Sequence, residues 1–263
     1  MSPSIGIGIT TRNRHAALNA GLAHFRQFHA DNMRYVVVDD SSDTPYDDVV
    51  AKYPELDVVL LRSNTRLGIA AAKNGCLGAL ADCDHVFLFD DDAWARSEGW
   101  AERWIAADDT HGIGHSMYVN HLNERDDVYK IIVTHGEGDT AMRWWTNCMG
   151  LALHFNRACL DAIGGYDWLG ARNVYGYEHA QISSRAENAG FTGSYTYASP
   201  AIIGDLVYSV DITARFHGEL PPLGEIPDSP PTVTPEEHAA LQLNSTLLLR
   251  SDPFVPLVNP FRR

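Results

Sequence analysis

A short apolar run that ends in three consecutive carboxylates is the feature of this sequence that most constrains its fold. Val86-Phe87-Leu88-Phe89 leads directly into Asp90-Asp91-Asp92. Such a run indicates a buried strand, and a strand that stops there brings its acid groups to one edge of a sheet. Three adjacent carboxylates repel one another, and a divalent cation relieves that repulsion. The sequence therefore predicts a metal site at a sheet edge, with an acidic strand end or a helix cap as the alternative.

Other apolar runs alternate with helical patterns through the first half of the chain. This alternation predicts an α/β fold with a mostly parallel sheet and right-handed crossovers. Polar residues follow several of the runs, and parallel sheets bind ligands at the carboxyl ends of their strands. Strands are expected at 5–9, 35–38 and 58–61, and helices near 18–28 and at 70–81.

The second half is less regular and ends in a proline-rich extension. Prolines cluster from residue 219 onward, which predicts an extended arm at 219–263 with a role in packing or oligomerisation. Within the arm, Pro235 offers a helix start that runs toward Leu249. Upstream, strands are expected at 130–133 and 149–155, and helices at 156–163 and 178–188.

Composition excludes several classes of protein. The 263 residues suffice for one large domain with an appendage. A net charge of −14 disfavours a broad basic surface for DNA. No stretch approaches the roughly 20 apolar residues of a membrane span, and no signal peptide pattern precedes the first strand, so we expect a cytoplasmic protein. The cysteines show no CxxC spacing and are expected to be buried thiols: Cys76, Cys83, Cys148 and Cys159.

Four segments, in order, resemble glycosyltransferase family 2 and its relatives with the GT-A fold. They are Ile9-Thr10-Thr11-Arg12-Asn13-Arg14, Val38-Asp39-Asp40-Ser41-Ser42, the stretch 64–75 and Phe89-Asp90-Asp91-Asp92. A fifth, 164–167 together with 175–179, resembles the acceptor-side motif of that family, and the match spans roughly 5–192. The resemblance implies a Rossmann-like central sheet flanked by helices. It also implies a GT-A domain at 1–218, with a nucleotide-sugar-binding half (1–118) and an acceptor-binding half (119–218).

The resemblance implies a donor site for a nucleotide diphosphate sugar, with a UDP-sugar as the first expectation. Asp40 has the position that accepts a hydrogen bond from the uracil imide, although Asp39 could do this instead. Lys73 stands where the family usually has an arginine near the base, but lysine lacks the planar fork of arginine. The implied donor-binding residues are Thr10, Thr11, Arg14, Asp39, Asp40, Asn64, Gly68, Lys73, Asp90 and Asp91.

The triplet at 90–92 matches the Asp-X-Asp motif of the family. The outer carboxylates, Asp90 and Asp92, face the metal and the ribose and are both candidate metal ligands, whereas strand alternation directs the middle one elsewhere. Mn²⁺ or Mg²⁺ at Asp92 would stabilise the departing nucleoside diphosphate. His217 lies at about the distance downstream where metal-dependent relatives place a third ligand, and an imidazole ligand favours Mn²⁺. His154, in an apolar strand, is expected to be structural.

The expected catalytic base departs from the family pattern. Inverting members usually have Asp after the Glu of the acceptor motif, whereas this chain has Glu178-His179. Either side chain could accept the proton of an acceptor hydroxyl, so both remain candidates. Asp167 is a further candidate for binding sugar hydroxyls. Aromatic rings stack on sugars, but they also pack at the edge of a core, and both roles are open for Trp144, Trp145, Trp168, Tyr175 and Tyr177. At most one of the two adjacent tryptophans should face the site.

The leading hypothesis is a metal-dependent glycosyltransferase that acts on a hydroxyl acceptor, with inversion favoured. One alternative is a glycosyltransferase of the same fold whose product retains the anomeric configuration of the donor sugar. Another is a non-catalytic nucleotide-sugar-binding module, motivated by His179. A nucleotidyltransferase fits less well, because 10–14 lacks the glycines of a phosphate-binding loop. The acceptor is left open among a glycan, a protein, a nucleobase and a small molecule.

Overall fold

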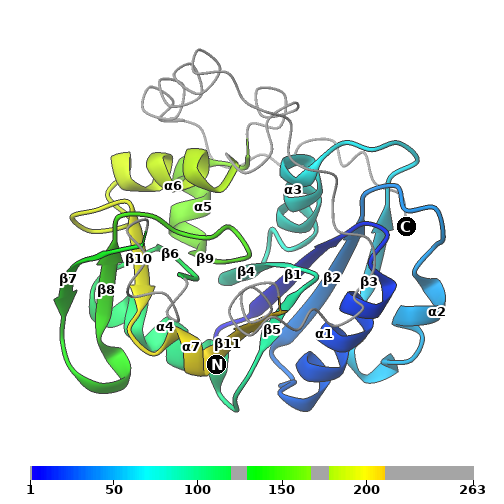
Figure 1. The fold of residues 1–263 in the computed structure, drawn as a ribbon, viewed down its shortest axis with the longest axis horizontal. Coiled ribbons are helices and arrows are strands. Elements are labelled where there is room, and N and C mark those ends of the chain that lie inside the picture. The colour runs from blue at the N-terminus through cyan, green and yellow to red at the C-terminus, as the bar shows by residue number, and fades with distance from the viewer. Residues whose placement is uncertain (1, 120–128, 167–177, 211–263) are drawn as a thin grey trace.

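The computed structural model describes residues 2–119, 129–166 and 178–210, and its centre is a six-stranded sheet (Figure 1). The strand order is β3-β2-β1-β4-β9-β6, in which β1 to β4 are parallel and β9 is antiparallel to both its neighbours. This arrangement confirms the expected mostly parallel GT-A-like sheet. The strands are β1 Ile5–Thr11, β2 Met33–Asp39, β3 Val59–Arg62, β4 His85–Asp90, β9 Ala152–Asn156 and β6 His115–Met117.

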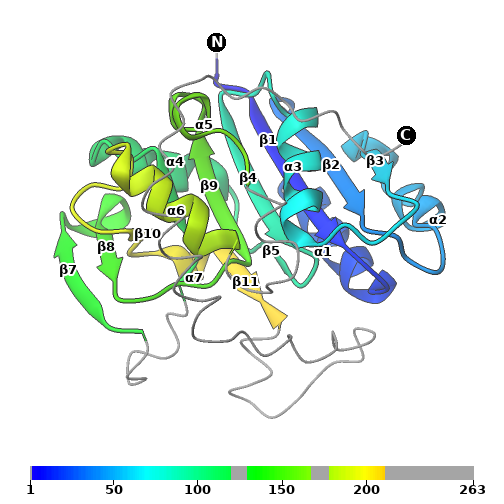
Figure 2. The same cartoon turned by 90° about the horizontal axis from the view of Figure 1, so that it is seen from above.

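Helices cover both faces of this sheet. On one face lie α3 (Ile69–Ala79), α5 (Arg157–Ile163) and α6 (Glu178–Asn188), and this face is turned toward the viewer in Figure 2. The opposite face is covered by α1 (His15–Gln27) and α4 (Trp100–Thr110). Shorter helical segments are α2 Asp47–Val50, η1 Pro54–Leu56, η3 Gly138–Thr140 and α7 Ile203–Leu206.

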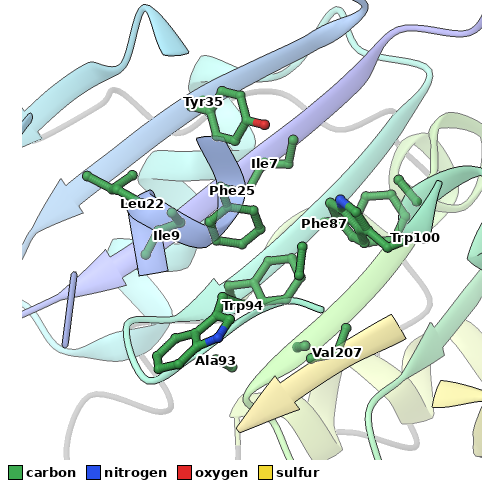
Figure 3. Close-up of a cluster of buried hydrophobic side chains, with 14 of the residues drawn as sticks. Ile7, Ile9, Leu22, Phe25, Tyr35, Phe87, Ala93, Trp94, Trp100 and Val207 are labelled. Atoms are coloured by element: carbon green, nitrogen blue, oxygen red, sulfur yellow. The ribbon is translucent and has the colours of Figure 1, made fainter. Parts of the chain in front are cut away.

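The strand β4 contributes to two apolar cores because its side chains alternate between the faces of the sheet. Phe87 and Phe89 point into the core beneath α1 and α4, whereas Val86 and Leu88 point into the core beneath α3, α5 and α6. All four are fully buried. Figure 3 shows the first core, including Ile7, Leu22, Phe25, Phe87 and Trp100.

Two small sheets flank the central one. One has the order β10-β8-β7, and the other pairs β11 with β5. Trp144 and Trp145, on β8, are both buried and lie in separate apolar clusters, so neither offers an open stacking platform. The strands of the two small sheets are β7 Ile131–His135, β8 Met142–Trp145, β10 Tyr197–Pro200, β5 Ala93–Ala95 and β11 Val207–Ser209. Of these five strands, only β7 was expected from the sequence.

Buried sulfur and imidazole groups are structural here. The four cysteines are buried and free, as expected. His154 is fully buried, and its Nδ1 lies 2.5 Å from Asp108 Oδ2, while its Nε2 lies 3.0 Å from His85 Nδ1. These contacts agree with a structural His154.

Several expected features lie outside the described residues. These are His217, the proline-rich arm at 219–263 with its helix from Pro235, and the site candidates Asp167, Trp168, Tyr175 and Tyr177. Within the described ranges, no helix combines the length and the apolar character needed to cross a membrane.

Candidate functional site

The acid triplet lies where β4 ends, next to the carboxyl end of β1. Thr11 Oγ1 donates to Asp91 Oδ2 at 2.7 Å. Arg14 Nη1 lies 3.1 Å from Asp91 Oδ1 and 2.9 Å from Asp92 Oδ2. Asp91 and Asp92 are buried, while the side chain of Asp90 is 33% exposed. The loop after β1 therefore holds two of the three carboxylates.

Protein cations already relieve part of the repulsion among these carboxylates. Arg14 forms ion pairs with Asp91 and Asp92, and Lys73 forms an ion pair with Asp90. Burial raises the pKa of Asp91 to about 8, although Arg14 opposes the shift. Burial also raises the pKa of Asp90, against the effect of Lys73. Crowded carboxylates alone are thus weaker support for a metal than the sequence suggested, because Arg14, Lys73 and partial protonation share the task.

Lys73 joins the acid triplet to Glu178, the first residue of α6. Its Nζ donates to Gly150 O at 2.8 Å and lies 3.4 Å from Asp90 Oδ1 and 3.5 Å from Glu178 Oε1. The side chain is fully buried; burial lowers its pKa, but the two carboxylates outweigh burial and raise it. A contact with the nucleotide base would require Lys73 to leave these partners.

The second pair of acids orders the loop before α3. Asp40 Oδ1 and Oδ2 accept from the backbone N–H groups of Leu67 and Gly68 at 2.7 and 2.8 Å. Gly68 has φ +89°, a conformation that glycine adopts without steric cost. Asp39 is fully buried, accepts from Ser42 N at 2.8 Å and lies 3.6 Å from Arg62 Nη1. Of these two acids, Asp40 is the more accessible. Asn64 is exposed in the same loop.

Glu178 and His179 begin α6 and differ in protonation. Burial raises the pKa of Glu178, but His179 and Lys73 lower it to about 2. Burial lowers the pKa of His179, but Cys148 and Glu178 raise it to about 10. At neutral pH, Glu178 is therefore a carboxylate and His179 an imidazolium. Glu178 Oε2 is buried and has no hydrogen-bond partner among the described residues, so its capacity to accept a hydrogen bond is not used within that part of the chain.

We expect His179 to make stability fall with rising pH. Its folded pKa of about 10 exceeds the ordinary value of about 6.5, so its contribution is complete below pH 6.5 and is lost as pH rises through 10. The slope is at most about 1.4 kcal/mol per pH unit. His179→Gln should flatten the decline of the unfolding free energy between pH 7 and 9, measured in urea. If the unfolding free energies of the wild type and His179→Gln depended on pH in the same way, this assignment would be contradicted. Asp91 titrates in both proteins, so its contribution cancels in the comparison.

Gly150 allows His179 to approach the loop before β9. A Cβ at residue 150 would lie 2.6 Å from His179 Nδ1, closer than carbon and nitrogen can pack. Gly150→Ala should therefore displace His179 and cost about 1–3 kcal/mol of stability. Gly21→Ala is the matched control, because its Cβ would have its nearest neighbour at 3.7 Å. Equal unfolding free energies for both variants in urea would refute this packing argument.

The structure adds positioning residues that sequence reasoning missed. Tyr46 OH bonds to Thr11 Oγ1 at 2.9 Å and accepts from Arg14 N at 2.8 Å, which orders the loop after β1. The side chain of Asn74 bonds to both the N–H and the carbonyl of Tyr166, at 2.7 and 2.8 Å, and so fixes the loop after α5 to α3. Asn74 lies in the stretch 64–75 that carries the family resemblance, but no role was assigned to it there. Tyr46 lay in no motif.

The donor chemistry of the triplet fits a hard divalent cation. Carboxylate oxygens, such as those of Asp90 and Asp92, are ligands that Mg²⁺ and Mn²⁺ accept. In the described part of the chain, no group of three or more His, Cys, Asp or Glu side chains is arranged to hold a metal. Further ligands would come from substrate phosphates or from water. The expected ligand His217 lies outside the described residues.

A mostly parallel sheet flanked by helices, with acids gathered at its carboxyl edge, defines a protein of the GT-A class. A family model described as glycosyl transferase family 2 matches residues 7–154, which is more than half of the chain. The chain belongs to this family and is a glycosyltransferase. No curated protein sequence matches it.

Solved structures share the fold at low sequence identity. One is the mannosyltransferase PcManGT from Pyrobaculum calidifontis in complex with GDP-Man and Mn²⁺: 19% identity, TM-score 0.58, covering 93% of this chain and 71% of that one. Another is S. aureus TarS 1-349 in complex with UDP: 18% identity, TM-score 0.52, covering 70% of this chain and 55% of that one. The chain thus spans about half of that TarS fragment. These likenesses concern the fold.

Proposed function

We propose that this protein transfers a sugar from a nucleoside diphosphate donor to a hydroxyl acceptor with inversion at the anomeric carbon. The observation that carries the proposal is one ion-pair network across the site. Lys73 contacts a carboxylate of the triplet and Glu178 of the acceptor motif. This network supports the proposal, because it links an acid that we expect to face the donor with the acid that we expect to act on the acceptor.

The chain's own residues divide the work of the reaction. Glu178 Oε2 takes the proton of the acceptor hydroxyl, whose oxygen attacks the anomeric carbon as the bond to the diphosphate breaks. His179, as an imidazolium, keeps Glu178 ionised. Asp40 and the loop that it orders face the nucleotide, and Asp90 faces the ribose. When bound at Asp92, Mn²⁺ or Mg²⁺ supplies Lewis-acid stabilisation of the leaving diphosphate.

The donor nucleotide is the first property to test. UDP remains our first expectation for the donor nucleotide. Because structures with a similar fold are in complex with UDP and with GDP-Man, GDP is the second nucleotide to test. A donor that binds only the folded state raises the melting temperature. We expect a shift with a UDP- or GDP-sugar in the presence of Mn²⁺, and a much smaller shift for Asp92→Asn. A response unchanged by Asp92→Asn would refute the role of that residue.

Turnover separates the enzyme from a binding module. Release of nucleoside diphosphate from the selected donor, with and without acceptors, should follow Mn²⁺ concentration. Binding without any hydrolysis or transfer across a broad donor panel would favour a non-catalytic module. The anomeric configuration of the product, read by NMR, then distinguishes inversion from the retaining alternative.

A further inference from the structure

Arg14 reaches from a fixed backbone into the acid triplet. Its N–H donates to Tyr46 OH at 2.8 Å, and its carbonyl accepts from Leu18 N at 3.1 Å. Its side chain is 14% exposed, and Nη1 lies between Asp91 Oδ1 and Asp92 Oδ2, at 3.1 and 2.9 Å. The anchor is therefore rigid, while the guanidinium stands at the edge of the site.

Arg14 contacts the carboxylate that a divalent cation would use. Two cations on one carboxylate repel each other, most strongly where water is partly excluded. Asp91 and Asp92 are both buried, so this repulsion is weakly screened. A metal ion that arrives alone must compete with Arg14 for Asp92.

A nucleoside diphosphate changes this balance. Its phosphates match the planar fork of arginine, which binds phosphate in a bidentate manner. We propose that Arg14 is the resident counter-ion of the acid triplet, and that it exchanges Asp91 and Asp92 for the donor's diphosphate when metal and nucleotide bind together. This inference rests on the proposed function and adds a dependence to it. The metal alone binds weakly, whereas the metal binds tightly together with the nucleotide.

The exchange predicts effects of opposite sign in one variant. Arg14→Gln removes the competitor, so Mn²⁺ alone should bind about tenfold more tightly. The same variant loses the phosphate contact, so UDP or GDP with saturating Mn²⁺ should bind about tenfold more weakly. Both affinities are measured by isothermal titration calorimetry, with electron paramagnetic resonance counting free Mn²⁺. If Arg14 acted only in folding, Arg14→Gln would bind both Mn²⁺ alone and the nucleotide with Mn²⁺ more weakly than the wild type.

Two further variants make the test specific. Arg12→Gln removes the same charge from an exposed neighbour in the same loop and should change neither affinity more than about twofold. Arg14→Lys keeps the charge but loses the fork, so its Mn²⁺ affinity should stay near that of the wild type while nucleotide binding falls. Urea unfolding of Arg14→Gln and Arg14→Lys establishes that each variant is folded before titration.

The outcomes separate this inference from the proposed function. If the wild type binds UDP or GDP with Mn²⁺, but Arg14→Gln binds Mn²⁺ alone no more tightly than the wild type, the counter-ion role is overturned. If Mn²⁺ binding tightens but nucleotide binding is unchanged, the exchange is overturned. If the wild type binds neither nucleotide, the proposed function fails, and the exchange fails with it.

Discussion

Lys73→Met is expected to destabilise the folded protein by about 3–5 kcal/mol, because it leaves two carboxylates beside an uncompensated, buried position. Methionine has a similar length and no charge, so packing changes little. Lys73 is fully buried and lies within 3.5 Å of both Asp90 and Glu178. The unfolding free energy in urea at pH 7 measures the loss.

Acid should diminish this loss, which distinguishes charge from packing. Without Lys73, the pKa of Glu178 rises from its present value of about 2, so Glu178 takes up a proton at a higher pH than in the wild type. The difference in stability between the two proteins should therefore shrink as pH falls from 7 to 4. Lys52→Met, on an exposed lysine 3.4 Å from Asn19 Oδ1, is the matched control and should cost under about 0.5 kcal/mol. Equal losses in both variants, or a loss independent of pH, would contradict the assigned role.

Glu178→Gln is expected to reduce sugar transfer by about 10²–10⁴-fold, because the amide cannot accept the hydroxyl proton. The substitution preserves shape, so binding of the nucleotide with Mn²⁺ should persist. Turnover of the donor identified by the melting-temperature screen gives the rate, and calorimetry gives the binding.

Two comparisons identify the base. His179→Gln should cost less activity, since His179 is already protonated at neutral pH with a pKa of about 10. Glu55→Gln removes an exposed carboxylate that lies 3.5 Å from Arg26 and should leave activity unchanged. A protein that keeps its turnover in Glu178→Gln and loses it in His179→Gln would reverse the assignment.

Local patterns in the sequence were sufficient for the main strands and helices. β1, β2, β4 and α3 were expected within a few residues, because continuous apolar runs and good helix formers mark them without reference to the rest of the chain. The ordered motifs also indicated the family that the match over 7–154 shows. The strands β5 and β6 were missed, since each has only three residues and β6 reads His-Ser-Met, with no apolar run. Tertiary pairing, not propensity, makes them strands.

The sequence by itself determined which acids gather at the carboxyl edge of the sheet, because strand ends and alternation are local properties. Only the tertiary structure decided which cations they meet. Arg14 and Asp92 are 78 residues apart, and Lys73 and Gly150 are 77 apart. Such pairs form because β1 and β4 are neighbours in the sheet and α3 packs beside the loop before β9. A buried charge is stabilised by what lies within a few ångströms, and that set is fixed by folding rather than by position along the chain.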